Sequence, residues 1–200
     1  MKHRIKILLA TIFSITLLCF GANTVSNPGF ETAGGGGADV FANWTEGTAG
    51  TSSVNDETVD VHGDSHACRL DIDASNNSAA VYNTLTLVVG ETYEISIWYK
   101  NSAADKTARF YLYDNMSHIW LKDDGTWASG VPTAITLPNS TSWTEYTLEF
   151  TVLGYTAYVL NINNNSAASS SIYLDDISID TYAASGMKGT VNIKGVINFK

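Results

Sequence analysis

Two short motifs at opposite ends of the chain contain carboxylates. Asn27-Pro28-Gly29-Phe30-Glu31 follows a hydrophobic leader, and Tyr173-Leu174-Asp175-Asp176-Ile177 lies near the C-terminus. Calcium takes about six to eight oxygen ligands, mainly carboxylate and carbonyl oxygens. If the first and last strands pair, Glu31 and an aspartate of the second motif can bind one calcium ion. Adjacent strand residues point to opposite faces, so only one of Asp175 and Asp176 is expected as a ligand.

Three expected strands place aromatic, amide or basic side chains on their polar faces. Apolar and polar residues alternate in residues 92–100, 107–115 and 156–163. Successive strand residues point to opposite faces, so the apolar set of each strand is expected to face the core. The outward side chains then include Glu94, Trp98, Arg109, Tyr111, Tyr113, Asn161 and Asn163.

Segments rich in Thr, Tyr, Val and Ile predict the strands that must position these groups. Clusters of Ser, Asn, Asp and Gly separate the segments, and no helical period of useful length interrupts them. The expected strands are residues 67–72, 79–88, 92–99, 108–113, 144–152, 156–163 and 172–179. We expect an all-β protein that folds as a two-sheet antiparallel β-sandwich of the jelly-roll type.

Two segments do not follow the strand pattern. Residues 33–38 contain a run of glycines and are expected to be a flexible loop. Residues 116–138 form a long connection that carries Trp120 and Trp127. Unstructured loops of this length are commonly functional or mobile. These tryptophans are expected either to form a movable wall beside the outward residues or to pin the loop onto the sandwich.

The first residues have the composition of a secretory signal. Lys2, Arg4 and Lys6 precede an apolar run that ends at small residues. We assign residues 1–22 to a signal peptide, 23–182 to one domain, and 183–200 to a tail that is a further strand or an attachment segment. The mature protein is expected to be secreted or extracellular. No second hydrophobic segment follows, so no membrane insertion is expected after signal removal.

Charge and cysteine content limit the partners of the chain. The net charge is −9, and removal of the basic leader makes it more negative, so nucleic acid and anionic membranes are repelled. Neutral partners and bound cations remain compatible with this charge. Cys68 is the one cysteine outside the leader, so an internal disulfide is excluded. Its place on an apolar strand face favours an inert buried thiol.

The sequence specifies no catalytic arrangement. Asp123 and Asp124 are paired carboxylates, but Asp123-Asp124-Gly125 is most simply a turn. His62 and His66 would share a face only in a helix, and here they lie in a loop that enters a strand. We therefore assign no catalytic residues and expect no enzyme.

Several motifs occur in an order that resembles a known family. They are the two terminal motifs, Trp44, His62-Gly63-Asp64-Ser65-His66-Ala67, Gly90-Glu91-Thr92-Tyr93 and Trp143. Over residues 27–180 the chain is similar to the carbohydrate-binding modules of families four, nine and twenty-two, which have a galactose-binding-like jelly roll. The resemblance implies a non-catalytic module that binds polysaccharide on the concave outer face of one sheet.

The resemblance also implies a structural calcium ion. Its expected ligands are Glu31, Asp175 or Asp176, and oxygen atoms of the loop around Asp64. Stacking against sugar rings would come from aromatic side chains, namely Trp98, Tyr111 and Tyr113, with Trp120 and Trp127 beside them. Hydrogen bonds to sugar hydroxyls would come from polar neighbours, namely Glu94, Arg109, Asn161 and Asn163.

These observations predict a secreted module that binds a neutral β-linked polysaccharide. The alternative is an extracellular structural or adhesive protein that uses the jelly roll as an assembly subunit. In that case the tail at residues 183–200 would mediate self-association by adding a strand to a neighbouring sheet.

Overall fold

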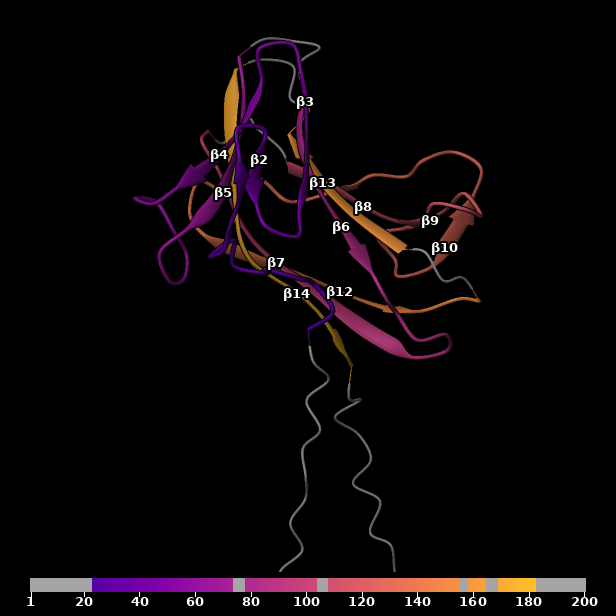
Figure 1. Ribbon diagram of the computed structural model, residues 1–200. Helices are drawn as coiled ribbons and strands as arrows, with labels where there is room; N and C mark the ends of the chain where they lie inside the picture. Colours follow the sequence, from indigo (N-terminus) through magenta and orange to yellow (C-terminus); the bar gives the residue numbers. More distant parts are fainter. Residues whose placement is uncertain (1–22, 74–77, 104–107, 155–157, 165–168, 183–200) are drawn as a thin grey trace, which may run out of the picture.

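Two antiparallel sheets form the protein, as seen in a computed structural model that describes residues 23–73, 78–103, 108–154, 158–164 and 169–182 (Figure 1). The predicted signal peptide at residues 1–22 and the predicted tail at residues 183–200 lie outside this described part. Among the described residues there is no helix long and apolar enough to span a membrane.

The larger sheet has seven strands. Its main path runs through β10 (Trp127–Ser129), β9 (Ile119–Leu121), β8 (Ala108–Asp114), β13 (Tyr158–Asn164), β6 (Ser78–Leu85) and β3 (Thr45–Ala49). The short strand β11 (Ile135–Thr136) pairs with the beginning of β8. Each neighbouring pair is antiparallel.

The smaller sheet has five strands, in the order β12 (Thr144–Thr151), β7 (Thr92–Asn101), β14 (Ser170–Thr181), β5 (Ala67–Ile72) and β4 (Ser53–Glu57). A separate hairpin joins β1 (Ala33–Gly36) to β2 (Asp39–Phe41). The predicted two-sheet antiparallel sandwich is confirmed, and each of the seven expected strands is present. Their ends differ by a few residues from the predicted ones, because apolar alternation marks the middle of a strand more clearly than its ends.

Apolar side chains fill the space between the sheets. Ile95 and Ile97 of β7 are fully buried, as are Phe110 of β8 and Leu160 of β13, and they belong to one continuous cluster. Removing one such side chain from water contributes about 1.5–3 kcal/mol. The alternating partners on the same strands face outward, so the pattern that builds the core also fixes which side chains each sheet presents to solvent.

Two predictions about irregular segments are wrong. Residues 116–138 contain β9, β10 and β11 and are not an unstructured connection. The β9–β10 turn is closed because the N–H of Lys122 donates to the carbonyl of Thr126, with Gly125 at a φ of 77°. The predicted flexible loop at residues 33–38 contains β1, which Asp39 holds by accepting the N–H of Gly35 at 2.7 Å. Strands this short carry too few residues for a recognisable alternation.

The first described residues lie beside the last strand, as Figure 1 shows. The N–H of Thr24 donates to the carbonyl of Ile179 at 3.0 Å, and the N–H of Ile177 donates to the carbonyl of Pro28 at 3.0 Å. Nδ2 of Asn27 donates to the carbonyl of Thr32, and Oδ1 of Asn27 accepts the N–H of Thr32. These two hydrogen bonds fold the N-terminal motif into a turn. The expected meeting of the two terminal motifs is confirmed.

Candidate functional site

A cleft of about 410 Å³ opens on the outer face of the seven-stranded sheet. Strands β6, β8, β9 and β13 provide most of its wall. Its lining is aromatic, amide or small, and it contains no charged side chain: Ser78, Ala80, Tyr82, Tyr111, Tyr113, Trp120, Pro132, Asn161 and Asn163. The cleft therefore offers flat apolar surfaces and neutral hydrogen-bonding groups together.

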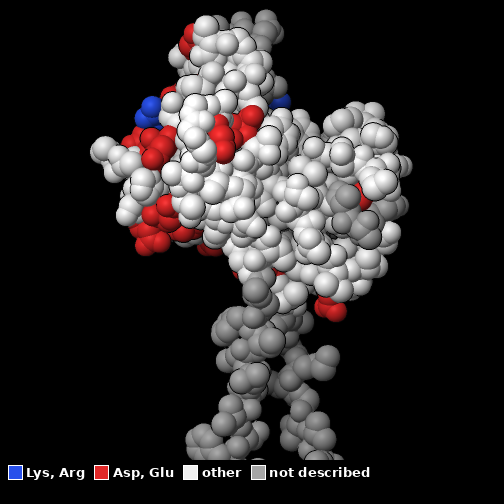
Figure 2. All heavy atoms as spheres, in the orientation of Figure 1, with Lys and Arg blue, Asp and Glu red and all other residues white. Residues whose placement is uncertain are grey.

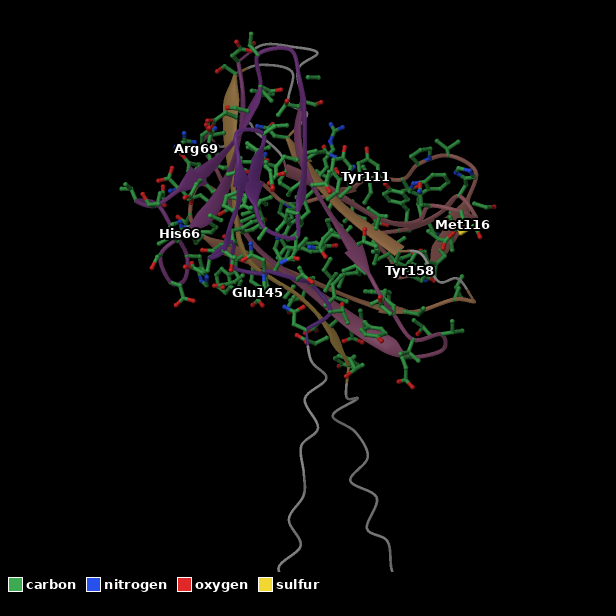
Figure 3. The ribbon with its side chains drawn as sticks, in the orientation of Figure 1. His66, Arg69, Tyr111, Met116, Glu145 and Tyr158 are labelled. Atoms are coloured by element: carbon green, nitrogen blue, oxygen red, sulfur yellow. The ribbon has the colours of Figure 1, made fainter. Side chains whose placement is uncertain are left out.

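The alternation of inward and outward residues along the strands explains why Tyr111 and Asn161 lie at the centre of the cleft. On β8, Phe110 and Leu112 are buried, so Tyr111 projects to the other face. In the neighbouring strands Asn161 lies directly between Tyr111 and Tyr82, because it is the partner of both in the two strand registers. Figure 3 shows Tyr111 on the outer side of this sheet and Tyr158 on the inner side. The predicted outward positions of Tyr111, Asn161 and Asn163 are confirmed.

Trp120 and Tyr113 form one end of the cleft. They are partners in the β8–β9 register, and their rings are stacked with centroids 6.4 Å apart. Burial, and then the nearby Tyr82, raise the pKa of the Tyr113 hydroxyl above its ordinary value. Tyr113 therefore stays a neutral hydrogen-bonding phenol at physiological pH. Of the two expectations for Trp120, the wall of a cleft is the one that the geometry matches.

Tyr82 belongs to the cleft but was absent from the sequence-based set. It lies on β6 between outward Ala80 and Thr84, and its ring covers Gly47 of β3. A Cβ atom on Gly47 would lie 3.0 Å from Cε2 of Tyr82, so the glycine provides the room that the ring occupies. The sequence indicated the outward position of Tyr82, because this residue alternates with the apolar residues Val81 and Leu85.

Two predicted residues lie on the other sheet. Trp98 and Glu94 project from the outer face of β7 in the five-stranded sheet, so they do not join the cleft. The imidazole ring of His62 stacks on Trp98 with centroids 3.7 Å apart and an angle of 16°. Alternation distinguishes inward from outward residues, but it does not tell which of two sheets a strand joins. Grouping Trp98 and Glu94 with the β8 residues was therefore wrong.

Trp127 faces the interior side of the β9–β10 hairpin. Its ring lies 5.4 Å from that of Tyr158 and 5.9 Å from that of Phe150, and its Nε1 donates to the carbonyl of Thr151 at 2.8 Å. Strand partners share a face, and the partner of Trp127 is the fully buried Leu121. Trp127 thus pins the hairpin to the sandwich, and its assignment to the cleft is corrected.

Arg109 lies at the end of the cleft opposite to Trp120 along β8. It is the strand partner of Asn163, which lines the cleft, and of Thr136 on β11. It shares the outward face of β8 with Tyr111 and is partly exposed. Arg109 is therefore beside the cleft and is not one of its lining residues.

Acidic side chains of the two terminal motifs meet at Gly29. A Cβ atom on this glycine would lie 3.4 Å from Oδ1 of Asp176 and 3.7 Å from both Oδ1 of Asp175 and Cγ of Glu31. The register of β14 with β7 shifts between Asp175 and Ser178, and Asp176 has a φ of 43°. This bulge brings Oδ1 of both aspartates near Gly29, although adjacent strand residues ordinarily point to opposite faces.

The loop between β4 and β5 contacts these acids through backbone N–H groups. Those of Ser65 and His66 donate to Oε1 of Glu31 at 3.0 and 2.9 Å, and those of His62 and Gly63 donate to Oδ2 of Asp175 at 2.9 and 3.1 Å. Burial raises the pKa of Asp175, although the N–H groups of Gly63 and His62 oppose this shift.

The loop was expected to contribute oxygen atoms to this site, and the contacts seen are from its backbone N–H groups and from Nδ1 of His62, which lies 2.7 Å from Oδ2 of Asp176. Asp64 itself is exposed. In the described ranges no group of three or more His, Cys, Asp or Glu residues is placed to hold a metal ion. Carboxylates and backbone carbonyls together would have to supply the ligands of any cation bound at Gly29.

The candidate acid pair Asp123 and Asp124 lies in the β9–β10 turn, as predicted. Oδ1 of Asp124 accepts hydrogen bonds from the N–H and the Oγ1 hydroxyl of Thr126 at 2.9 and 2.6 Å. Hydrogen bonds from Thr126, above all, lower the pKa of Asp124 to about 2. This carboxyl is ionised at neutral pH, which does not suit a general acid.

The chain is similar to proteins that bind carbohydrates. The profile of a family described as a carbohydrate binding domain, CBM_4_9, matches residues 22–168. A comparison with curated proteins gives no match. The solved structure of TmCBM61 in complex with β-1,4-galactotriose is similar, with 16% sequence identity, a TM-score of 0.57, and coverage of 80% of this chain and 99% of that chain.

Two further solved structures share the fold. The CBM22-1 xylan-binding domain of Paenibacillus barcinonensis Xyn10C has 17% identity and a TM-score of 0.51, with coverage of 80% of this chain and 95% of that one. The enzymatically active domain of tailspike protein 4 of bacteriophage CBA120 has 21% identity and a TM-score of 0.57, and the match covers 80% of this chain but 21% of the tailspike chain.

Proposed function

The chain belongs to the carbohydrate binding domain family, and from this premise we propose that it binds a β-linked polysaccharide in the cleft of its seven-stranded sheet. The observation that carries the proposal is the composition of the cleft. Tyrosine and tryptophan rings stand beside the amides of Asn161 and Asn163, with no charged group among them. Sugar rings have an apolar face and a rim of hydroxyls, so they need this combination of surfaces.

The contacts suggest how binding energy would arise. Trp120, Tyr111 and Tyr82 present rings for stacking, each worth about 1 kcal/mol. The side-chain amides can both donate to and accept from sugar hydroxyls. Asn163 donates to Oδ1 of Asn161 at 3.3 Å, which orients the two amides relative to each other. Several such weak contacts would give an affinity between about micromolar and millimolar.

Retention on immobilised or gel-embedded polysaccharides tests the proposal. The wild-type chain should be slowed by at least one of a panel of β-linked glucans, xylans, mannans and galactans. Tyr111→Ala should reduce that retention, because Tyr111 lies at the centre of the cleft. A matched tyrosine on the other sheet, Tyr173, should be replaceable by alanine without this effect. Equal migration of wild type and Tyr111→Ala on every polymer would exclude the cleft as the binding site.

Calcium binding at the junction of the terminal motifs is the second part of the proposal. The side chains of Glu31, Asp175 and Asp176 approach Gly29, with Oδ1 of each aspartate and Cγ of Glu31 within 3.7 Å of the position of a Cβ atom there. This donor set is of the type that calcium prefers. Bound there, the ion would neutralise these acids and join the N-terminal motif to the last strand, on a part of the molecule that does not line the cleft.

Export and the absence of catalysis complete the proposed function. The signal-like composition of residues 1–22 supports secretion, which N-terminal sequencing of the protein recovered from the culture medium would test. The neutral lining of the cleft supports a binding role without catalysis, because hydrolysis of a glycosidic bond generally uses two carboxyl groups. Release of reducing sugar from a retained polymer would contradict it.

A further inference from the structure

Among the described cationic side chains, Arg109 differs from the others in that it has no ionic partner within the described residues. The described part of the chain contains four Lys and Arg residues. Arg69 bonds Glu57 and Asp71, Lys100 bonds Asp60, and Lys122 bonds Asp124. Within the described residues, Arg109 forms no ion pair, although acids outnumber bases in the sequence by 20 to 11.

The surroundings of Arg109 are polar but uncharged. Its strand partners are Asn163 on one side and Thr136 on the other, and the next outward residue of β8 is Tyr111. None of these can neutralise a guanidinium group. Figure 2 shows acidic side chains gathered over the β2–β5 side of the molecule, whereas the visible face around β8–β10 is mostly uncharged. A cation that has no ionic partner among the described residues and lies beside a neutral cleft is available to a ligand in that cleft.

We propose that the polysaccharide bound in the cleft carries a carboxylate, as a uronate residue or substituent, which pairs with Arg109. This inference rests on the proposed function and refines it. The neutral cleft takes the uncharged part of the glycan, and the guanidinium group binds the carboxylate where the chain passes Asn163. A guanidinium group presents parallel N–H donors that match the two oxygens of a carboxylate, which gives a charge-assisted contact with defined geometry.

Polymers that differ only in their carboxyl groups provide the test. Glucuronoxylan and β-1,4-linked polymannuronate would each be compared with the same polymer after chemical reduction of its carboxyl groups to hydroxymethyl groups. At least one uronate polymer should bind the wild type about tenfold more tightly than its reduced form, as is typical for a hydrogen bond to a charged group. Added NaCl should weaken this preference. The overall negative charge alone would produce the opposite salt effect, because salt screens repulsion as well.

Variants at two cations assign the effect to Arg109. Arg109→Gln should abolish the preference for the uronate polymer. Arg109→Lys should keep part of it, because lysine has the positive charge but lacks the parallel N–H donors of the guanidinium group. Lys100→Gln makes the same change in net charge on the other sheet and should keep the wild-type preference. Thermal unfolding of each variant would show that the fold is intact.

The outcomes separate this inference from the proposed function. Equal binding of native and reduced polymers, or an unchanged preference in Arg109→Gln, would overturn the role of Arg109 and leave the cleft as a neutral glycan site. Binding of neutral polymers alone would do the same. Failure to bind any polymer, native, reduced or neutral, would overturn the proposed function and this inference with it.

Discussion

Trp120 and Tyr113 are partners on two neighbouring strands, and their rings are stacked with planes inclined by 24°. Tyr113 comes from the long strand β8, and Trp120 comes from the short hairpin strand β9. The hairpin is itself held by Trp127, whose ring packs against Phe150 and Tyr158. The aromatic end of the cleft therefore depends on a tryptophan on each face of one small hairpin.

Trp120→Ala is expected to weaken polysaccharide binding about fivefold, because a stacked ring contributes about 1 kcal/mol. Isothermal titration with the polymer that retains the wild type best would measure the change. Trp98→Ala is the matched control, since it removes a tryptophan from the outer face of the other sheet. If both variants lost affinity equally, the cleft would not be the only surface that contacts the glycan.

Sequence alternation predicted the sandwich and the outward positions of Tyr111 and Asn161. It succeeded because β7, β8 and β13 are long enough for a period of two to be visible, with apolar residues on one face only. It could not assign strands to sheets, because strand pairing over a long sequence separation depends on the whole core. Trp98 was placed with the β8 residues for this reason.

Local irregularities explain why the sequence did not predict the orientations of Trp120, Trp127 and Asp176. The short strands β9 and β10 leave only a few residues to display an alternation, so the opposite orientations of Trp120 and Trp127 were not visible in the sequence. The bulge at Asp176 reverses the side-chain direction expected for adjacent aspartates. Tyr82, in contrast, followed an alternation that the sequence displayed, and the same reasoning applied to β6 would have found it.

Gly47→Ala should weaken binding by displacing a neighbouring ring. The added Cβ would lie 3.0 Å from Cε2 of Tyr82, so the tyrosine ring must shift by a few tenths of an ångström from its place in the cleft. We expect a loss of about two- to fivefold, up to the 1 kcal/mol that one stacked ring supplies. Gly154→Ala is the control, because nothing lies within 4 Å of its Cβ position.

A double-mutant cycle tests whether Gly47→Ala weakens binding through Tyr82. If Gly47 acts by placing Tyr82, then Gly47→Ala should have little further effect on affinity in a Tyr82→Ala background, because contacting residues are not additive. Additive losses in the two single variants would show that the alanine at position 47 acts in some other way.

Thr126→Val should raise the pKa of Asp124, as measured by NMR titration of its carboxyl carbon. The wild-type pKa is expected at about 2, chiefly because the Thr126 hydroxyl and N–H donate to Asp124. Valine removes the hydroxyl and keeps the N–H, so the pKa should move partway to the ordinary value of 3.8. Since folding lowers this pKa, its contribution to stability is present above the ordinary value and is lost as the pH falls toward 2. Thr126→Ser should keep the low pKa.

Chelation of calcium should lower the melting temperature if the ion binds at Gly29. A ligand present at about 100 times its Kd stabilises the native state by about 2.7 kcal/mol, which corresponds to about 5–10 °C for a domain of this size. In Glu31→Gln the melting temperature should respond much less to EDTA, because an amide replaces the carboxylate of one of the proposed ligands. Asp124→Asn, in the distant β9–β10 turn, should keep the full response. Calorimetry in calcium and in EDTA measures each shift, and an equal melting temperature of the wild type in both solutions would exclude a structural calcium ion.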